Sequence, residues 1–235
     1  MPSKKHERGI TIYTVIIMML LGMLLALWAS RTAIFSEMIT GNDADYQRAF
    51  EAAQAMIQDA QQDIYRNLYD KHQSPKRKDG VATLPADQAS FIDWASQMPA
   101  PSYCRHGVCL RITGAENFWD DEAALTSMLA TGARYGTYSG ATGAADTNPI
   151  LNLTAPNKGA WYWIEPIQFK GSEIGSKQSV LEGKFAASPQ ADMVFRITSV
   201  AFGIKGSSDS IEISDRSKTM AVIQTIVALP PNPGE

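Results

Sequence analysis

Residues 10–29 form an uninterrupted apolar run around which the rest of the chain is organised. None of these 20 positions carries a charge. At about 1.5 Å of rise per residue, a helix of this length covers roughly the 30 Å hydrocarbon core of a bilayer. Lys4, Lys5 and Arg8 precede the run. Because basic residues stay on the cytoplasmic side, the pattern predicts a single-pass transmembrane segment at 10–30 with a cytoplasmic N-terminus.

A second hydrophobic pattern follows at residues 31–70, where apolar side chains recur every three or four positions. This spacing places them on one face of a helix, with polar residues such as Glu51, Gln58 and Asp59 on the other faces. The high alanine content also favours a helix. We therefore expect an amphipathic spine helix. Its apolar stripe consists of Tyr46, Phe50, Ala53, Ile57, Ala60, Ile64 and Leu68.

Shorter elements replace the long helix after residue 70. Pro75 and Gly80 interrupt the helical pattern and indicate a linker. Two short helices are predicted at 86–98, with Phe91, Ile92 and Trp94 facing inward, and at 120–131. Segments rich in β-branched and aromatic residues predict strands at 161–169, 193–204 and 218–229.

These elements predict an α+β fold. A long N-terminal transmembrane and spine helix precedes a globular head at 71–235 that is built on an antiparallel β-sheet. The segment 132–158 is rich in Gly, Thr and Ala, and we expect a long loop there. Loops of this length are uncommon unless they are functional or mobile, so this loop is a candidate contact surface.

Composition limits the classes of protein that fit. A chain of 235 residues with 45% hydrophobic content supports one membrane segment and one modest domain. The first nine residues hold three Lys/Arg and one Glu, which leaves 18 basic and 23 acidic residues after them. The only later basic cluster, at 76–78, reads as a solvated loop between Pro75 and Gly80. Nothing in this charge pattern indicates binding to nucleic acid.

Cys104 and Cys109 are the only cysteines, and both follow the predicted membrane segment. Exported thiols tend to be oxidised, so we expect a disulfide that pins a turn ahead of a strand at 110–112. Closing so short a ring contributes only about 2 kcal/mol. The alternative is a zinc site that includes His106, but no fourth ligand is obvious.

The head offers little catalytic chemistry. Its two histidines are His72, in the linker, and His106, between the cysteines. A hydrolase needs a nucleophile with a base, and neither histidine belongs to a catalytic motif such as Gly-x-Ser-x-Gly. Residues 171–177 partly match a phosphate-binding loop but lack its Gly-Lys-Ser/Thr order, which indicates a turn between strands. The acids at 120–122 suit a helix N-terminus better than a calcium site. We expect no enzymatic activity, cofactor or metal.

The change from charge at Arg8 and Gly9 to the apolar run at Ile10 resembles the processing site of type IV prepilins. In that family a basic leader, here 1–9, ends in Gly. The resemblance implies that prepilin peptidase cuts between Gly9 and Ile10 and that Ile10 is then N-methylated. Ordinary pilins carry Glu at the fifth mature position, where this chain has Thr14. By resemblance that Glu pairs with the amine of the neighbouring subunit, so a chain without it suits the pilus tip, where no subunit lies ahead.

The resemblance narrows after the anchor. Glu-Met-Ile-Thr-Gly-Asn at 37–42 and Arg-Ala-Phe-Glu-Ala-Ala-Gln-Ala at 48–55 resemble the corresponding segment of PilX-type minor pilins. Residues 161–165, 195–198 and 220–225 resemble strands of their heads. The resemblance implies a bacterial inner-membrane precursor with a periplasmic head. It also implies assembly with other minor pilins, the major pilin and a large adhesin in a complex that primes the pilus and stays at its tip, with the spine stripe packing against other pilins.

Three other interpretations fit parts of the pattern. A tip pseudopilin of type II secretion would share the leader, the spine and the missing Glu. A membrane-anchored periplasmic enzyme or binding module would share only the anchor. A cleaved signal peptide would need a small-x-small site, and Leu27 and Trp28 place bulky residues where small ones are required.

Overall fold

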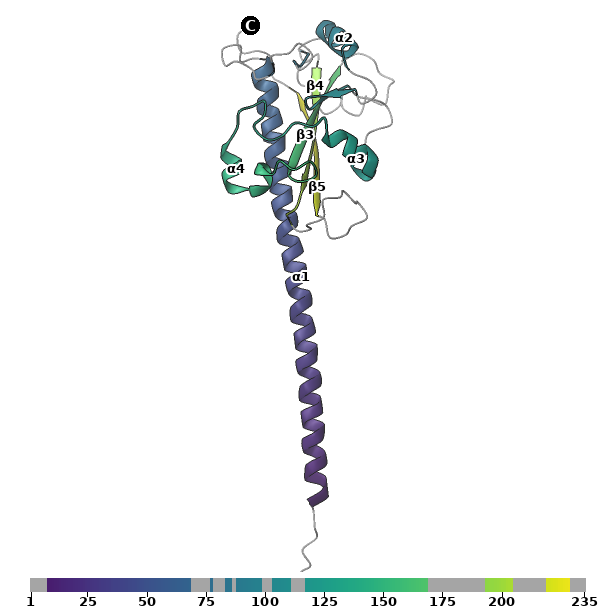
Figure 1. The fold of residues 1–235 in the computed structure, drawn as a ribbon, viewed down its shortest axis with the longest axis vertical. Helices are drawn as coiled ribbons and strands as arrows, with labels where there is room; N and C mark the ends of the chain where they lie inside the picture. The colour runs from purple at the N-terminus through teal and green to yellow at the C-terminus, as the bar shows by residue number, and fades with distance from the viewer. Residues whose placement is uncertain are drawn as a thin grey trace, which may run out of the picture. The chain divides into compact units, whose positions relative to one another are not determined.

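The computed structural model describes residues 8–68, 77, 83–85, 88–98, 103–110, 117–168, 193–204 and 219–228. Contacts divide the chain into two compact units, Met1–Ala44 and Asp45–Glu235. Helix α1 spans Arg8–Leu68 and contributes to both (Figure 1). The predicted long helix is therefore present, and it continues without a break through Gly41 and Asn42.

The first unit exposes the apolar part of α1. Every described side chain from Thr11 to Thr40 is exposed. Of the described helices, α1 is long and apolar enough to cross a membrane, judged by length and composition. Apolar surface of this extent has no favourable place in water, which is the pattern expected of a helix that lies in lipid.

The second unit contains a five-stranded sheet in the order β1-β2-β3-β4-β5. The three long strands are β3 (Ala160–Gln168), β4 (Met193–Phe202) and β5 (Met220–Ala228), which pair antiparallel as predicted. All ten residues of β4 are buried, because strands flank both of its edges and hydrophobic clusters cover both of its faces.

A two-residue hairpin completes the sheet. Strands β1 (Cys104–Arg105) and β2 (Val108–Cys109) pair antiparallel, and β2 joins β3 in parallel through Val108 and Ile164. The predicted strand at 110–112 is therefore displaced toward the N-terminus within the described residues, since Leu110 lies after β2. Residues 111 and 112 lie outside the described part of the chain.

Short helices surround the sheet. They are α2 (Gln88–Ser96), the 3₁₀ turn η1 (Phe118–Asp120), α3 (Glu122–Leu129), α4 (Gly143–Thr147) and the 3₁₀ turn η2 (Pro149–Asn152). In α3, the carboxylate of Asp121 accepts a hydrogen bond of 2.7 Å from Ala124 N. The acids at 120–122 thus begin a helix as expected, with Asp121 as its N-cap.

The side chains of α2 that face the core are only partly those predicted. Trp94 is buried and Phe91 packs against the core, but the side chain of Ile92 is 65% exposed. Phe91 and Trp94 are three residues apart and share a face of the helix, whereas Ile92 points roughly 100° away. The predicted inward position of Ile92 is wrong for this reason.

Two hydrophobic clusters cover opposite faces of the sheet, because side chains alternate along β3. Tyr162 and Ile164 belong to the cluster with α1, while Trp161 and Trp163 belong to the cluster with α3. Figure 1 shows α1 and α3 on either side of β3. On the α1 side, four alanines let the helix lie close to the strands, and three larger side chains fill the space beside them. These α1 residues are Ala49, Ala52, Ala53, Met56, Ile57, Ala60 and Ile64.

The predicted spine stripe divides into two parts. Ala53, Ile57, Ala60 and Ile64 are buried against the sheet of the same chain, and Leu68 packs against that cluster. Tyr46 and Phe50 are 47% and 39% exposed. The expectation that the whole stripe packs against other subunits is therefore wrong for its buried members. Tyr46 and Phe50 remain available for such packing.

The segment 132–158 is more ordered than the expected loop. It contains α4 and η2, and Ala133 forms an isolated bridge with Tyr162 of β3. Arg134 lies over the Trp161 ring, with its guanidinium carbon 3.7 Å from the ring centroid, and donates hydrogen bonds to three carbonyl groups of residues 153–158. Burial lowers the pKa of Arg134 to about 10, so its guanidinium remains charged at neutral pH.

Candidate functional site

The functional residues predicted at the N-terminus lie at the start of α1. The backbone of Gly9 and Ile10 belongs to the first turn of the helix. Thr14 is exposed, and its hydroxyl donates a hydrogen bond of 2.9 Å to the Thr11 carbonyl. A hydroxyl that bonds to its own helix needs no partner subunit in a membrane, in contrast to a carboxylate at the same position.

Further along α1, three buried aspartates attach the helix to the rest of the second unit. Asp45, Asp59 and Asp63 are almost completely inaccessible to solvent. The prediction that Asp59 lies on a polar outer face is wrong, because Asp59 is buried. Positions 45 and 63 are 18 residues apart, about five turns at 3.6 residues per turn, and therefore share a face with the buried alanines. The sequence signal for buried aspartates that attach the helix was their position on the same helix face as the alanines.

Asp45 and Asp59 bind backbone groups of segments distant in sequence. Asp45 accepts a hydrogen bond of 2.9 Å from Ile204 N, just after β4. Asp59 accepts one of 2.9 Å from Gly136 N and another from the Ser139 hydroxyl. Arg66 donates to the Ser139 carbonyl. The segment predicted as a contact surface thus contacts α1 of its own chain.

Asp63 forms a buried ion pair with Arg77. The Arg77 Nε lies 2.9 Å from Asp63 Oδ1, and its Nη2 lies 2.7 Å from Oδ2. The hydroxyl of Tyr162 donates to Asp63 Oδ2 over 2.8 Å. The prediction of a solvated basic cluster at 76–78 is therefore wrong for Arg77, which is 2% exposed. Lys76 and Lys78 lie outside the described residues.

The charges of this pair are stabilised by each other. Burial disfavours a charged guanidinium, but the hydrogen bonds and negative charge of Asp63 outweigh burial and hold the pKa of Arg77 above its ordinary value. Burial, followed by the neighbouring Asp63, raises the pKa of Tyr162 well above its ordinary value. Tyr162 therefore remains protonated and able to donate.

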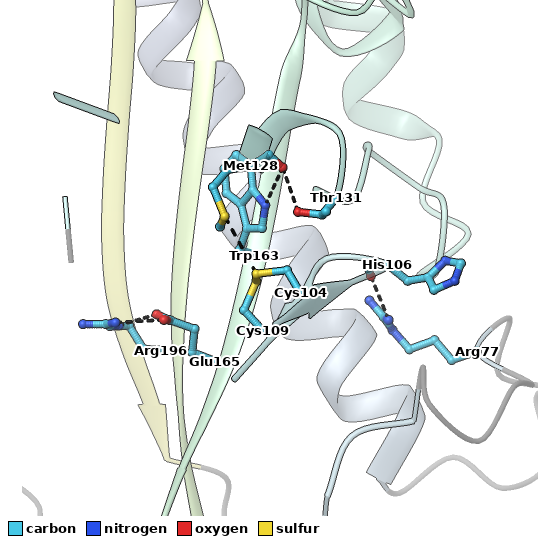
Figure 2. The surroundings of a disulfide bond; sticks show 9 residues. All are labelled: Arg77, Cys104, His106, Cys109, Met128, Thr131, Trp163, Glu165 and Arg196. Carbon is cyan, nitrogen blue, oxygen red and sulfur yellow. Dashed lines mark hydrogen bonds and ion pairs between the residues drawn. A yellow bond between two sulfur atoms is a disulfide. The ribbon is translucent and has the colours of Figure 1, made fainter. Parts of the chain in front are cut away.

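The disulfide lies in the β1–β2 hairpin, whose His106 carbonyl meets Arg77 (Figure 2). Cys104 and Cys109 are directly opposite each other in the β1–β2 hairpin, with Cα atoms 4.0 Å apart. The two turn residues have positive φ, 54° at His106 and 74° at Gly107, as in the tight turns that suit hairpins. The carbonyl of His106 accepts a hydrogen bond of 2.9 Å from Arg77.

The zinc alternative finds no support around His106. Its Nδ1 lies 2.9 Å from the hydroxyl of Tyr138, and both neighbouring cysteines are in the disulfide. Across the described residues, no group of three or more His, Cys, Asp or Glu side chains is arranged to hold a metal ion. His72 and the predicted turn at 171–177 lie outside the described part of the chain.

The arrangement as a whole is suited to holding segments together. Asp45, Asp59 and Asp63 bind, respectively, an amide after β4, a turn of 132–158 and Arg77. The Ser199 hydroxyl of β4 also donates to the Ala53 carbonyl of α1 over 2.9 Å. Buried carboxylates whose oxygens are occupied by such donors serve to orient backbone segments.

Comparisons with known proteins address the N-terminal part of the chain. Residues 8–58 match a protein-family model described as PilX N-terminal. Comparison with curated proteins and with solved structures gave no significant match. The matched segment contains the exposed apolar helix and the first half of the α1 face that packs on the sheet. This match, on the helix that precedes a mostly antiparallel sheet, supports a PilX-type pilin.

Proposed function

We propose that this protein is a minor pilin that helps to prime assembly of the type IV pilus and remains in its tip complex with other minor pilins and an adhesin. The observation that carries this proposal is the PilX N-terminal match over residues 8–58, on a helix whose apolar residues are exposed. Pilins are structural subunits, so the protein acts by assembly.

The proposed maturation takes place at the start of α1. Prepilin peptidase removes residues 1–9, and Ile10 becomes the methylated N-terminus. Until assembly, the helix anchors the protein in the bacterial inner membrane with its head in the periplasm. In the pilus, the exposed residues of α1 in the first unit pack against the helices of neighbouring pilins. Tyr46 and Phe50 are exposed residues of the second unit that also suit such packing.

Thr14 supports a place at the tip. An unpaired carboxylate in a membrane helix is unfavourable, by about 2.5 kcal/mol or more at the helix centre. A subunit with no neighbour ahead of it has no amine to pair with such a carboxylate. Thr14 avoids this cost, because its hydroxyl bonds to the Thr11 carbonyl of its own helix.

Counting pili tests the proposal. Deletion of the gene should strongly reduce the number of pili per cell, and a plasmid copy should restore it. In the same strain, Thr14→Glu should give no more pili than the natural sequence, while the conservative Thr14→Ser should restore assembly. An unchanged pilus count after deletion would contradict the priming role, and loss of an exported protein instead would indicate a type II secretion pseudopilin. A gain of assembly with Thr14→Glu would contradict placement at the tip.

A further inference from the structure

The last strand of the sheet, β5, is paired along one edge. In the order β1-β2-β3-β4-β5 it follows β4, with which it forms nine residue pairs. No described strand lies on its other side. At about 3.4 Å per residue, β5 gives this side of the sheet an edge of roughly 30 Å. The opposite edge of the sheet is formed by β1, which has two residues.

The register shows which backbone groups of β5 point away from β4. Tyr162 of β3 exchanges backbone hydrogen bonds with Ala133, and therefore on the side of β3 that faces away from β4. Its partner in β4, Ser199, then directs its own N–H and C=O groups toward Ile223 of β5. Since these directions alternate along a strand, the even-numbered residues of β5 direct their backbone groups outward. They are Met220, Val222, Gln224, Ile226 and Ala228.

This edge lacks the features that usually prevent strands of different molecules from pairing. Natural sheets protect an exposed edge with charged side chains, proline, a bulge or a covering segment. The sequence of β5 contains no charged residue, proline or glycine, and its pairing with β4 runs without a bulge. Eight of its nine residues are at least partly exposed, whereas all ten residues of β4 are buried. An edge of this length and composition favours pairing with a further strand.

The side chains in the second half of β5 indicate what such a strand would contact. Val222 packs against the cluster with α3, and Val227 packs against the cluster with α1. Ile226 is apolar and partly exposed, and it belongs to neither cluster of the described residues. Gln224 is exposed, and its Nε2 donates a hydrogen bond of 3.0 Å to the Thr198 hydroxyl. A strand beside β5 would cover Ile226 with an apolar side chain and place an uncharged one next to Gln224.

A second copy of this chain does not fit the edge. Two β5 strands would pair antiparallel about a two-fold axis normal to the sheet. This axis reverses every direction within the sheet, so the parts of α1 that lie along the two sheets would run in opposite directions (Figure 1). In copies anchored in one membrane through α1, these helices are parallel. The other edge of a second copy offers only the two residues of β1.

We propose that β5 is a docking edge for an extended segment of a different protein, which extends the sheet as a strand antiparallel to β5. Main-chain hydrogen bonds to the outward groups of β5 supply the affinity. The segment is uncharged, because a charged side chain beside β5 would lose water without meeting an opposite charge. That the donor is another component of the pilus tip rests on the proposed function, whereas the docking edge itself does not.

Binding of a synthetic strand tests the docking edge. The probe is the dye-labelled peptide Thr-Val-Thr-Ile-Thr-Val-Thr, capped at both ends, and its binding to the full-length protein in detergent is measured by fluorescence anisotropy. A control peptide has the same side chains but N-methylated amides, so it cannot donate main-chain hydrogen bonds. The probe should bind saturably, and the control at least about tenfold more weakly. Both peptides partition alike into detergent, so equal affinity would overturn the proposal.

Hydrogen exchange locates the bound peptide. In the protein alone, the outward amides of Val222, Gln224 and Ile226 should exchange faster than those of Ile223 and Thr225, which face β4. The peptide should slow exchange of the outward amides at least about tenfold and change the other two little. Protection of the outward amides without peptide would overturn the proposal. If it grew with protein concentration, a second copy would cover the edge, and if it did not, the chain itself would.

Charge variants provide matched controls. Gln224→Lys and Gln224→Glu should each weaken binding of the peptide about tenfold, because both place a charge at the centre of the edge. Their melting temperatures should stay close to that of the natural protein, since Gln224 is exposed. Gln224→Thr, and Gln97→Lys at an exposed position outside the sheet, should bind normally. Unchanged binding by both charge variants would contradict docking at β5. Because these assays need no pili, their failure is distinguishable from failure of the proposed function.

Discussion

At the scale of single residues, burial acts differently on the aspartates of α1. Arg77 donates hydrogen bonds to both carboxylate oxygens of Asp63. The interactions that favour a charged Asp59 do not outweigh the effect of its burial. Burial raises its pKa above the ordinary value, and the nearby charge of Asp63 adds to this, while hydrogen bonds from Ser139 and Gly136 and the charge of Arg66 oppose it. A raised pKa means that the folded protein binds a proton at Asp59 more tightly than the unfolded chain does.

Replacement of Asp59 should therefore change how stability depends on pH. With the folded pKa above the unfolded one, the contribution of Asp59 to stability is greatest at low pH and declines as pH rises from about 3.8 through the folded pKa. Asp59→Asn cannot ionise and should remove this part of the decline. Melting temperatures of the full-length protein in detergent, measured by tryptophan fluorescence from pH 4 to pH 8, report the difference.

The exposed residue Asp93 supplies the control for that series. Asp93→Asn should leave the pH profile of the natural sequence almost unchanged, because exposed carboxylates contribute little. A profile for Asp59→Asn that runs parallel to the natural one over the whole range would contradict the assigned role of Asp59.

At the scale of elements, α1 presents different surfaces along its length. Up to Thr40 its described side chains are exposed and mostly apolar. From Asp45 onward, alanines and a few larger residues pack on the sheet, while Tyr46 and Phe50 stay partly exposed, with ring centroids 6.4 Å apart. A substitution in the second part should therefore affect either folding or assembly, depending on which way the side chain faces.

Phe50 and Ile57 should separate these two effects. Phe50→Asp places a charge on an exposed surface, so stability should change by less than about 1 kcal/mol while pilus number falls. Ile57→Asp places an unpaired charge against the sheet and should destabilise the second unit by about 3 kcal/mol or more. Melting curves and pilus counts of both variants check this.

The conservative Phe50→Leu controls for loss of the aromatic ring and should assemble normally. If Phe50→Asp cells carry the natural number of pili, the exposed pair is not an assembly surface.

Truncation at two positions tests the contribution of α1 to the second unit. A soluble fragment that begins at Asp45 retains the helix face buried on the sheet and should melt cooperatively. A fragment that begins at Leu84 lacks seven buried residues of that cluster together with Asp59 and Asp63. It should remain unfolded, because the apolar face of β3 and β4 would be open to water. A cooperative melt of the shorter fragment would show that the sheet folds without the helix.

At the scale of the whole molecule, the maturation that we propose removes the leader and frees α1 for assembly. The basic leader ends at Gly9 and the apolar run begins at Ile10, so we expect cleavage between Gly9 and Ile10. Gly9→Glu should leave the full-length precursor in the membrane, because prepilin peptidase requires glycine at this position in the family that the leader resembles. Intact-mass measurement of the natural protein should give a chain that begins at N-methylated Ile10.

Gly9→Ala serves as the milder variant in that experiment and should retain partial cleavage. A mature chain that begins beyond Ala29 would instead indicate a conventional signal peptide.

The features that could be predicted from the sequence are those that repeat locally. The charge-free run at 10–29, the helical spacing that follows it and the β-branched segments of β3, β4 and β5 each carry their signal within a few consecutive turns or residues. Two cysteines five residues apart likewise allow a single disulfide, which closes a short loop. Local periodicity decides which element forms, so these predictions needed no knowledge of distant contacts.

Only the tertiary structure decided what each face of these elements contacts. Asp59 meets Ser139 across 80 positions, and Ser199 meets the Ala53 carbonyl across 146. Neither separation leaves a periodic trace in the sequence. The sequence alone predicts a solvated Arg77, because composition does not reveal its buried pairing with Asp63. Burial of a charge is favourable only where a distant partner meets it, and that meeting is a property of the folded chain alone.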